Sequence, residues 1–419
     1  MERNRILSGR PEADSVTGFS LLIWFGVLVF WAIMWVTRGE YIELYFFTDH
    51  LDTAMDYFNP LSFVTNPDPW STNANYPACA YLFFKIMLVL VPPNKWGIGR
   101  DMRLEMNAQL TYILFLLVCL IVIWEVLRCL AKGGYWKKTL FASSLLFSGP
   151  LVWTVERGNI LLLVLALTLL FFALYDSEKF ALRLLGYVCL AIAAAMKIYP
   201  AVFGLMVLWR RRYRETALLV VLGIFFFLAP FFVWNGIDSI MDMLADMKLL
   251  FAAQTAGKGF GYNFCMKNLV QLVAALFSVY LADVPSWVAA LSAVICLILF
   301  VVTKQEWQKL YTLVMICIWY PGFSYTYTLV FLFLPIISYF FRTKEQQRGR
   351  FHKVYPVLFA LTMVPYALPM VDRVNALIGA EYLPYPTSWG TIVINGILVL
   401  LTVLIGVDVL LSREKEKVK

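Results

Sequence analysis

Residues 181–214 read ALRLLGYVCLAIAAAMKIYPAVFGLMVLWRRRYR, which is two short apolar runs that meet at a lysine and a proline. The runs, Leu184–Met196 and Ala201–Trp209, join at Lys197–Pro200 and have basic residues on both distal flanks. Under the positive-inside rule both flanks are cytoplasmic, so we expect the join on the outer side of a membrane. Pro200 breaks the helix there, and the freed backbone groups need polar neighbours.

Basic clusters of the same kind recur between apolar stretches along the whole chain. The sequence is 61% hydrophobic and 15% charged, whereas a soluble domain averages about 45–50% apolar and about 25% charged residues. The clusters are Arg3/Arg5/Arg10, Arg128/Lys132/Lys137/Lys138, Lys179/Arg183, Arg210/Arg211/Arg212/Arg214, Lys304/Lys309, Arg342/Lys344/Arg348/Arg350/Lys353 and Arg413/Lys415/Lys417/Lys419. Each marks a cytoplasmic segment. The pattern therefore predicts an all-α polytopic membrane protein with both termini cytoplasmic.

The net charge of +8 is explained by these clusters, because basic residues at cytoplasmic helix ends face anionic lipid. We therefore expect membrane lipids and no nucleic acid as partners. The threading predicts about 12 transmembrane helices in a single integral membrane domain, residues 1–419. The expected spans are about Val16–Thr37, Leu110–Leu130, Leu140–Thr154, Ile160–Tyr175, Leu184–Met196, Ala201–Trp209, Ala217–Trp234, Trp287–Val302, Tyr311–Tyr320, Leu329–Phe341, Val354–Met370 and Gly390–Leu411.

Two longer polar segments are expected outside. Residues 38–106 form a long outer loop with interfacial helices after the first span, and residues 235–267 form a second outer loop. Two apolar pieces, 78–91 and 269–281, are short for a crossing, so we interpret the first as interfacial or re-entrant and leave the second unassigned.

The first outer loop carries Asp49, Asp52 and Asp56, spaced i, i+3 and i+7, which is one face if the stretch is helical. A carboxylate held at a partly desolvated interface is suited to act as a general base. The alternative is a solvated loop whose acids only oppose the cytoplasmic positive charge.

Two cations interrupt apolar runs on the same predicted side. Arg157 and Asn159 lie at a join between short runs, and Lys197 lies at the break before Pro200. A charge at such a depth is costly and indicates a functional site, for example one that holds an anionic phosphate. The alternative is a side chain that reaches the headgroups from a helix end.

Together these segments resemble glycosyltransferase family 87, multi-span enzymes of the GT-C superfamily. The shared motifs are the acidic, aromatic segment around Asp52–Asn59, the element Asn75–Ala78, Arg157-Gly158-Asn159, the Ala-rich helix ending at Lys197–Pro200 with Arg210–Arg212 beyond it, and an outer asparagine, Asn263. The sequence departs from the family at Asn75–Ala78, where a second proline is missing. It departs again at Thr326-Tyr327, where the family often has His-Tyr.

The resemblance implies an inverting enzyme that transfers a hexose, most often mannose, from a polyprenyl-phosphate donor at the outer face. It implies a glycolipid or glycan acceptor and Asp56 as the base, with Asp52 and Asp49 as alternatives. Lys197 and Arg157 would neutralise the leaving phosphate. The residues implied to line the substrate site are Asn59, Tyr76, Asn159, Tyr199, Asn263 and Tyr327. Neither a metal nor another cofactor is expected, and a bacterial plasma membrane is the simplest location.

Two other functions fit parts of the pattern. Broken helices with polar apices also suit a secondary transporter, although its site would lie within spans rather than in an outer loop. A lipid-sugar flippase or a noncatalytic assembly subunit would need no outer carboxylate.

Overall fold

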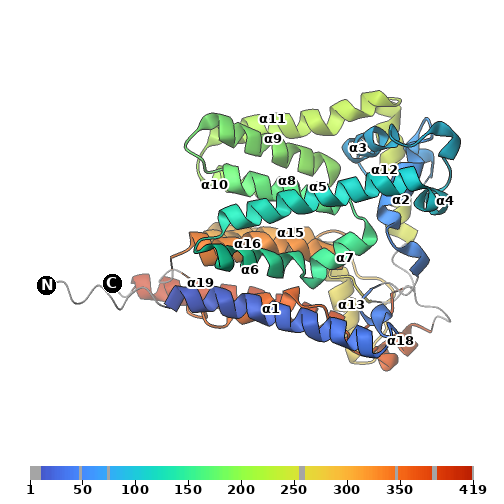
Figure 1. The fold of residues 1–419 in the computed structure, drawn as a ribbon. Helices are drawn as coiled ribbons and strands as arrows, with labels where there is room; N and C mark the ends of the chain where they lie inside the picture. Colours follow the sequence, from blue (N-terminus) through green and yellow to red (C-terminus); the bar gives the residue numbers. More distant parts are fainter. Residues whose placement is uncertain are drawn as a thin grey trace.

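A computed structural model of the chain describes residues 11–46, 50–72, 76–253, 260–344, 348–379 and 385–417. Over these ranges every named element is a helix, which confirms the all-α fold (Figure 1). The α-helices are α1 (Pro11–Val36), α2 (Met55–Phe63), α3 (Ala78–Leu88), α4 (Gly99–Leu104), α5 (Met106–Leu130), α6 (Tyr135–Leu146), α7 (Gly149–Arg157), α8 (Leu161–Leu174), α9 (Phe180–Met196), α10 (Leu205–Trp209), α11 (Tyr213–Leu228), α12 (Ile237–Ala253), α13 (Met266–Leu276), α14 (Ser286–Val302), α15 (Glu306–Trp319), α16 (Phe333–Ile337), α17 (Tyr355–Met363), α18 (Asp372–Ile378) and α19 (Trp389–Lys417). The short elements are η1 (Ile42–Leu44), η2 (His50–Asp52), η3 (Pro69–Thr72), η4 (Pro93–Lys95), η5 (Tyr199–Gly204), η6 (Ala229–Val233), η7 (Thr326–Leu332) and the π-helical turn η8 (Ser338–Arg342).

Four segments of the described chain are long and apolar enough to cross a membrane, and they agree with four of the predicted spans. They are Ser15–Val36, Met106–Leu130, Tyr213–Val233 and Trp389–Leu411. Seven further apolar helices have only 10–17 residues. Twelve crossings are therefore not confirmed, because most of the other predicted spans are shorter than the roughly 20 residues that a hydrocarbon core requires.

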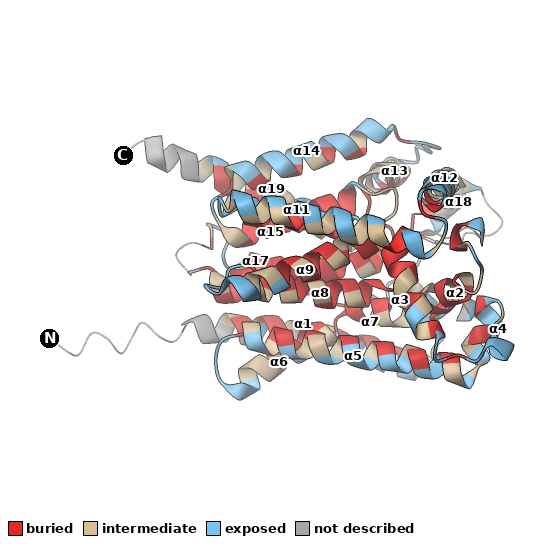
Figure 2. Cartoon of the chain, turned by 90° about the horizontal axis from the view of Figure 1, so that it is seen from above, coloured by how far each residue is buried: buried red, intermediate tan, exposed pale blue. Residues whose placement is uncertain are grey.

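The outer helices expose apolar side chains in a way that a soluble protein avoids. Val221 on α11 is 62% exposed, Phe25 on α1 is 66% exposed, and their neighbours on the same faces are similar. By contrast, α15 is buried along nearly its whole length in the middle of the bundle (Figure 2). A large apolar surface around a buried centre is what lipid contact requires, so the chain is an integral membrane protein.

The polar segments contain more helix than the sequence reasoning predicted. The expected second outer loop, residues 235–267, contains the 17-residue helix α12. Its acids Asp238, Asp242 and Asp246 recur every four residues, and Ser239 and Met243 form its buried side. This helix is amphipathic, so hydropathy alone does not reveal it. The short pieces 78–91 and 269–281 become α3 and α13, each of 11 residues.

The bundle has two distinct ends. The start of α1 and the end of α19 lie at one end, which we call the terminal end, and α2, α4, α12 and α18 lie at the other, the carboxylate end (Figure 1). Shared acids bring several basic clusters together, since Arg210 and Arg342 both bind Glu306. Arg210 binds Asp176 at 2.9 Å, and Arg342 binds Glu306 at 3.2 Å. These clusters therefore lie at the same end of the bundle, and their side of the membrane stays a prediction.

Candidate active site

The two described acids of the first polar segment are brought together by a break in the chain, not by one continuous helix. Asp52 ends η2, and Asp56 lies in the first turn of α2. Between them Ala54 has a φ of 59°, in the left-handed region, and its N–H donates to the carbonyl of Glu156 at 2.8 Å. Asp52 and Asp56 therefore do not share one face of a continuous helix. Asp49 lies outside the described residues.

Arg157 connects the two carboxylates. At the end of α7, its Nη1 donates to Asp52 Oδ2 at 2.6 Å and its Nη2 donates to Asp56 Oδ1 at 2.7 Å. Nη1 also donates to the carbonyl of Asp52 at 2.9 Å. The Arg157 side chain is 6% exposed, whereas those of Asp52 and Asp56 are 37% and 24% exposed. The cation is thus enclosed behind the acids, and the acids keep an accessible side.

Gly158 and Asn159, the two residues after Arg157, also hold α2 and Asp56 in position. Gly158 ends α7 with a φ of 63°, and a Cβ at this position would lie 3.0 Å from the Cβ of Tyr57. Only glycine fits both the left-handed turn and the close approach of α2. Asn159 then donates from Nδ2 to Asp56 Oδ2 at 2.7 Å, while its Oδ1 accepts the N–H of Leu161 at 2.9 Å. The hydrogen bond from Leu161, the first residue of α8, therefore orients the Asn159 amide so that its nitrogen faces Asp56.

Lys197 approaches the same acids from α9. Its Nζ lies 4.4 Å from the ring centroid of Tyr76 and 5.7 Å from that of Tyr327. Lys197 lies beyond the end of α9 and outside the four long apolar helices. Burial lowers the pKa of Lys197 to about 8, although the charge of Asp56 opposes this effect. Its ammonium is thus a weakly solvated cation with aromatic faces and a carboxylate as neighbours.

Tyr76 joins the lysine to the acids. Its hydroxyl lies 3.5 Å from Asn159 Nδ2, and burial raises its pKa well above the usual value, with the charge of Asp56 adding to the shift. The hydroxyl therefore remains protonated. Tyr199 is half-buried nearby, and its hydroxyl is buried without a hydrogen-bond partner among the described residues. A buried hydroxyl of this kind is available to a ligand.

Asn59 and Asn263, two further predicted site residues, make contacts that support the fold, and their roles toward a substrate stay predictions. Asn59 packs its carboxamide against Gly99 at the start of α4, where a Cβ on that glycine would lie 2.2 Å from Asn59 Oδ1. Asn263 accepts the N–H of Ser324 at 3.0 Å and that of Cys265 at 3.2 Å through Oδ1. Asn263 therefore joins its own loop to the segment at Ser324.

The sequence reasoning missed an aromatic group beside the acids. Trp153 lies 5.4 Å from the ring of Tyr327 and 6.3 Å from that of Tyr325, and Tyr325 lies 5.6 Å from Tyr385. Burial raises the pKa of Tyr385, and the charge of Asp52 raises it further. These rings come from α7, from the start of η7 and from the segment before α19, which lie far apart in the sequence. No local pattern could have assembled them.

A third acid and a second arginine were also missed. Glu156 lies beside Arg157, and its burial raises the pKa of its carboxyl, an effect that Arg157 counteracts. Arg103 on α4 donates through Nη1 to the carbonyls of Leu51 and Thr53, at 2.7 and 3.0 Å. It thereby fixes the backbone on both sides of Asp52. Glu156 could have been identified from its place next to Arg157, whereas nothing in the sequence around Arg103 links it to Asp52.

An apolar groove of about 560 Å³ begins next to the lysine. It lies between α9, the η5–α10 segment and α11, and Ile198, the residue after Lys197, forms part of its wall. The other lining residues are almost all apolar, and they include Gly204 and Gly223. In the part of the chain that the structure describes, no group of three or more His, Cys, Asp or Glu side chains is placed to hold a metal ion.

The sequence model of glycosyltransferase family 87 matches residues 74–319, which is more than half of the chain, so this chain belongs to that family. The protein is therefore a membrane glycosyltransferase, which acts on a sugar donor and an acceptor. The matched region includes Arg157 and Lys197 and begins after Asp56. No curated protein and no solved structure matches the chain.

Proposed function

We propose that this protein transfers a hexose, most often mannose, from a polyprenyl-phosphate donor to a glycolipid or glycan acceptor, with inversion at the anomeric carbon. The observation that carries the proposal is the arrangement of Asp56 and Lys197. A partly accessible carboxylate and a half-buried lysine, on separate elements, are close enough for the charge of one to act on the other. The aromatic faces of Tyr76 and Tyr327 lie beside the ammonium.

In this proposal Lys197 binds the phosphate of the donor, because an ammonium forms charge-assisted hydrogen bonds to phosphate oxygens. The groove that starts at Ile198 holds the first isoprenoid units, since its wall is apolar and borders α11. A lipid-linked sugar needs both features side by side, an anion site and an apolar channel. Their adjacency supports a lipid donor over a nucleotide sugar.

Asp56 acts as the base. It accepts the proton of the acceptor hydroxyl as that oxygen forms a bond to the anomeric carbon. The bond from this carbon to the phosphate oxygen breaks, and polyprenyl phosphate leaves with its new negative charge against Lys197. Attack from the carboxylate side and departure on the lysine side invert the anomeric centre. Asp52 is the alternative base, because it shares Arg157 and is more accessible.

For Arg157 the geometry supports a positioning role. Its guanidinium binds both carboxylates, and its side chain is enclosed behind them. We propose that Arg157 fixes the carboxylates against the acceptor, whereas the role implied by the resemblance, neutralising the leaving phosphate, stays a prediction. The aromatic group of Trp153, Tyr325 and Tyr385 offers stacking faces for the acceptor sugar. We place this site on the outer face of a bacterial plasma membrane, with both termini cytoplasmic.

The test is sugar transfer by purified protein in liposomes, with radiolabelled polyprenyl-phosphate mannose and a lipid extract as acceptor. Wild type is compared with Asp56→Asn and Lys197→Gln, and with the control Asp101→Asn, an exposed acid on α4. We expect a new glycosidic product from wild type and control, and at least about 100-fold less from the two site variants. Wild-type activity in Asp56→Asn would transfer the base role to Asp52 or Asp49. Movement of the label across the membrane without a new glycosidic bond would favour a flippase or transporter.

A further inference from the structure

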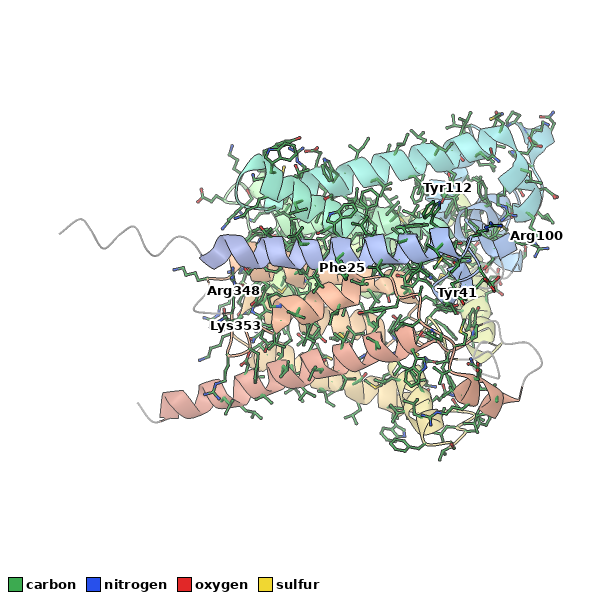
Figure 3. The ribbon with its side chains drawn as sticks, turned by 60° about the horizontal axis from the view of Figure 1, so that its bottom comes forward. Phe25, Tyr41, Arg100, Tyr112, Arg348 and Lys353 are labelled. Carbon is green, nitrogen blue, oxygen red and sulfur yellow. The ribbon has the colours of Figure 1, made fainter. Side chains whose placement is uncertain are left out.

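A second cavity, of about 370 Å³, lies at the terminal end, far from the carboxylates. It is enclosed by α1, by η8 and by the segment that leads into α17. Its lining residues are Ser15, Gly18, Phe19, Leu22, Tyr339, Arg348, His352, Lys353, Pro356 and Val357. Figure 3 shows Arg348 and Lys353 beside the first turns of α1, at the opposite end of the molecule from Tyr41 and Arg100. The sequence motifs of the family do not include this region.

The cavity is a wedge between two helices. A Cβ on Gly26 of α1 would lie 2.4 Å from a methyl carbon of Val364, so the two helices touch there. Gly18 is two turns nearer the terminal end, roughly 12 Å along the helix axis, and a Cβ there would have nothing within 4 Å. The space between α1 and the α17 region therefore opens toward the terminal end and closes toward the middle of the bundle.

Apolar and basic side chains occupy separate parts of this wedge. Phe19, Leu22 and Val357 supply the apolar wall, whereas His352 and Lys353 are exposed at the mouth.

Arg348 is 4% exposed and donates to the carbonyls of Tyr339 and Phe340, both at 3.1 Å. Among the described residues that line the wedge, none is an acid. Asp408 is close to the adjoining loop, but its carboxylate accepts from the Tyr355 hydroxyl at 2.6 Å and from the N–H of Arg350 at 3.0 Å.

We propose that this wedge binds one anionic phospholipid. The phosphate would lie at the mouth against Lys353 and His352, with Arg348 adding positive charge behind them, and one acyl chain would lie between α1 and the α17 region. Basic pockets between membrane helices recognise anionic headgroups in this way. The apolar wall favours a lipid over a free phosphate ion, because the buried part of the wedge would otherwise hold water against apolar side chains. This site is independent of the proposed transfer reaction.

The experiment is native mass spectrometry of the purified protein titrated with phosphatidylglycerol, phosphatidylcholine or inorganic phosphate. Two variants each remove one feature. Lys353→Gln removes a cation from the mouth, and Gly18→Leu fills the wedge with a residue that also favours helix. Their matched controls are Lys179→Gln, an exposed lysine elsewhere, and Gly396→Leu, an exposed glycine of α19 with the same open surroundings.

We expect wild type and both controls to retain one phosphatidylglycerol molecule more firmly than phosphatidylcholine. Each wedge variant should bind it about tenfold or more weakly, the scale of one lost charge-assisted contact. Equal retention of phosphatidylcholine, or unchanged affinity in Gly18→Leu, would overturn the proposal. Inorganic phosphate that binds as well as the lipid would show an ion site instead. Helicity and the thermal midpoint of each variant show whether it is folded.

Discussion

Substituting Arg157 by lysine tests whether this arginine positions the two carboxylates or binds the phosphate of the donor. The guanidinium contacts Asp52 with one nitrogen and Asp56 with another, at 2.6 and 2.7 Å. A lysine keeps the positive charge but presents a single nitrogen on a flexible stem, so it cannot bind the two carboxylates in a fixed fork. If Arg157 positions the acids, Arg157→Lys should impair the chemical step. If it binds the donor phosphate, the same variant should chiefly weaken donor binding.

The magnitude follows from the contacts that are lost. A hydrogen bond to a charged group contributes about 1.5–3 kcal/mol. Because Asp52 and Asp56 are 37% and 24% exposed, water replaces part of what is lost, and we take about 2 kcal/mol. In a transition state, this corresponds to a rate factor of about 30. We expect kcat to fall by about this factor, with the KM for the lipid donor little changed.

The assay is steady-state sugar transfer with the donor varied at a saturating acceptor concentration. Arg100→Lys is the matched control, because Arg100 is an exposed arginine at the same end of the bundle (Figure 3). Its kinetic constants should equal those of wild type. A wild-type kcat for Arg157→Lys together with a raised donor KM would refute the positioning role. It would favour the phosphate-binding role that the family resemblance implies.

Three further outcomes follow from the same site. Because the pKa of Lys197 is lowered to about 8, its ammonium loses its proton as pH rises through that value. The kcat/KM for the donor should therefore fall above about pH 8, and Lys197→Arg should move this limb to higher pH. Gly158→Ala places a side chain at a φ of 63° and against Tyr57, and should lower the thermal midpoint, whereas Gly396→Ala should not. Gly223→Leu fills the groove, and should raise the KM for a long-chain donor more than for a short-chain analogue.

The ends of the elements were predictable because charge and helix breakers are local signals. The basic flanks around residues 181–214 predicted two helices that join at Lys197–Pro200. In the structure α9 ends at Met196, Lys197 is extended, and η5 begins at Tyr199, so Pro200 lies in the first turn after the break. The number of crossings was not predictable in this way. Hydropathy counts apolar runs, but α17 is only nine residues long, and α12 is a polar amphipathic helix in an expected loop. Whether such short helices cross depends on tertiary packing, which composition does not encode.

The identity of the candidate site was partly predictable for the same reason. Lys197 and Arg157 were identified as charges between apolar runs, and both lie near Asp56. The partner of Arg157 was not predictable, because it depends on a left-handed residue at Ala54 and on its backbone bond to Glu156. Those contacts join segments about 100 residues apart, and no periodicity within either segment indicates them.

The break at Lys197 explains how two neighbouring residues can lie in different surroundings, one beside the acids and one in the apolar groove. Lys197 has φ −141° and ψ 118°, an extended conformation that ends α9. Ile198 returns to helical angles, with φ −59° and ψ −38°, so the helix is interrupted at Lys197. Lys197 contacts Tyr76, while Ile198 lines the apolar groove. Pro200, two residues further on, prevents the helix from continuing, so a cation and the wall of an apolar groove lie on adjacent residues. A lipid-linked phosphate has the same two parts, one charged and one apolar, joined by a single bond, and this match is why we favour a lipid donor.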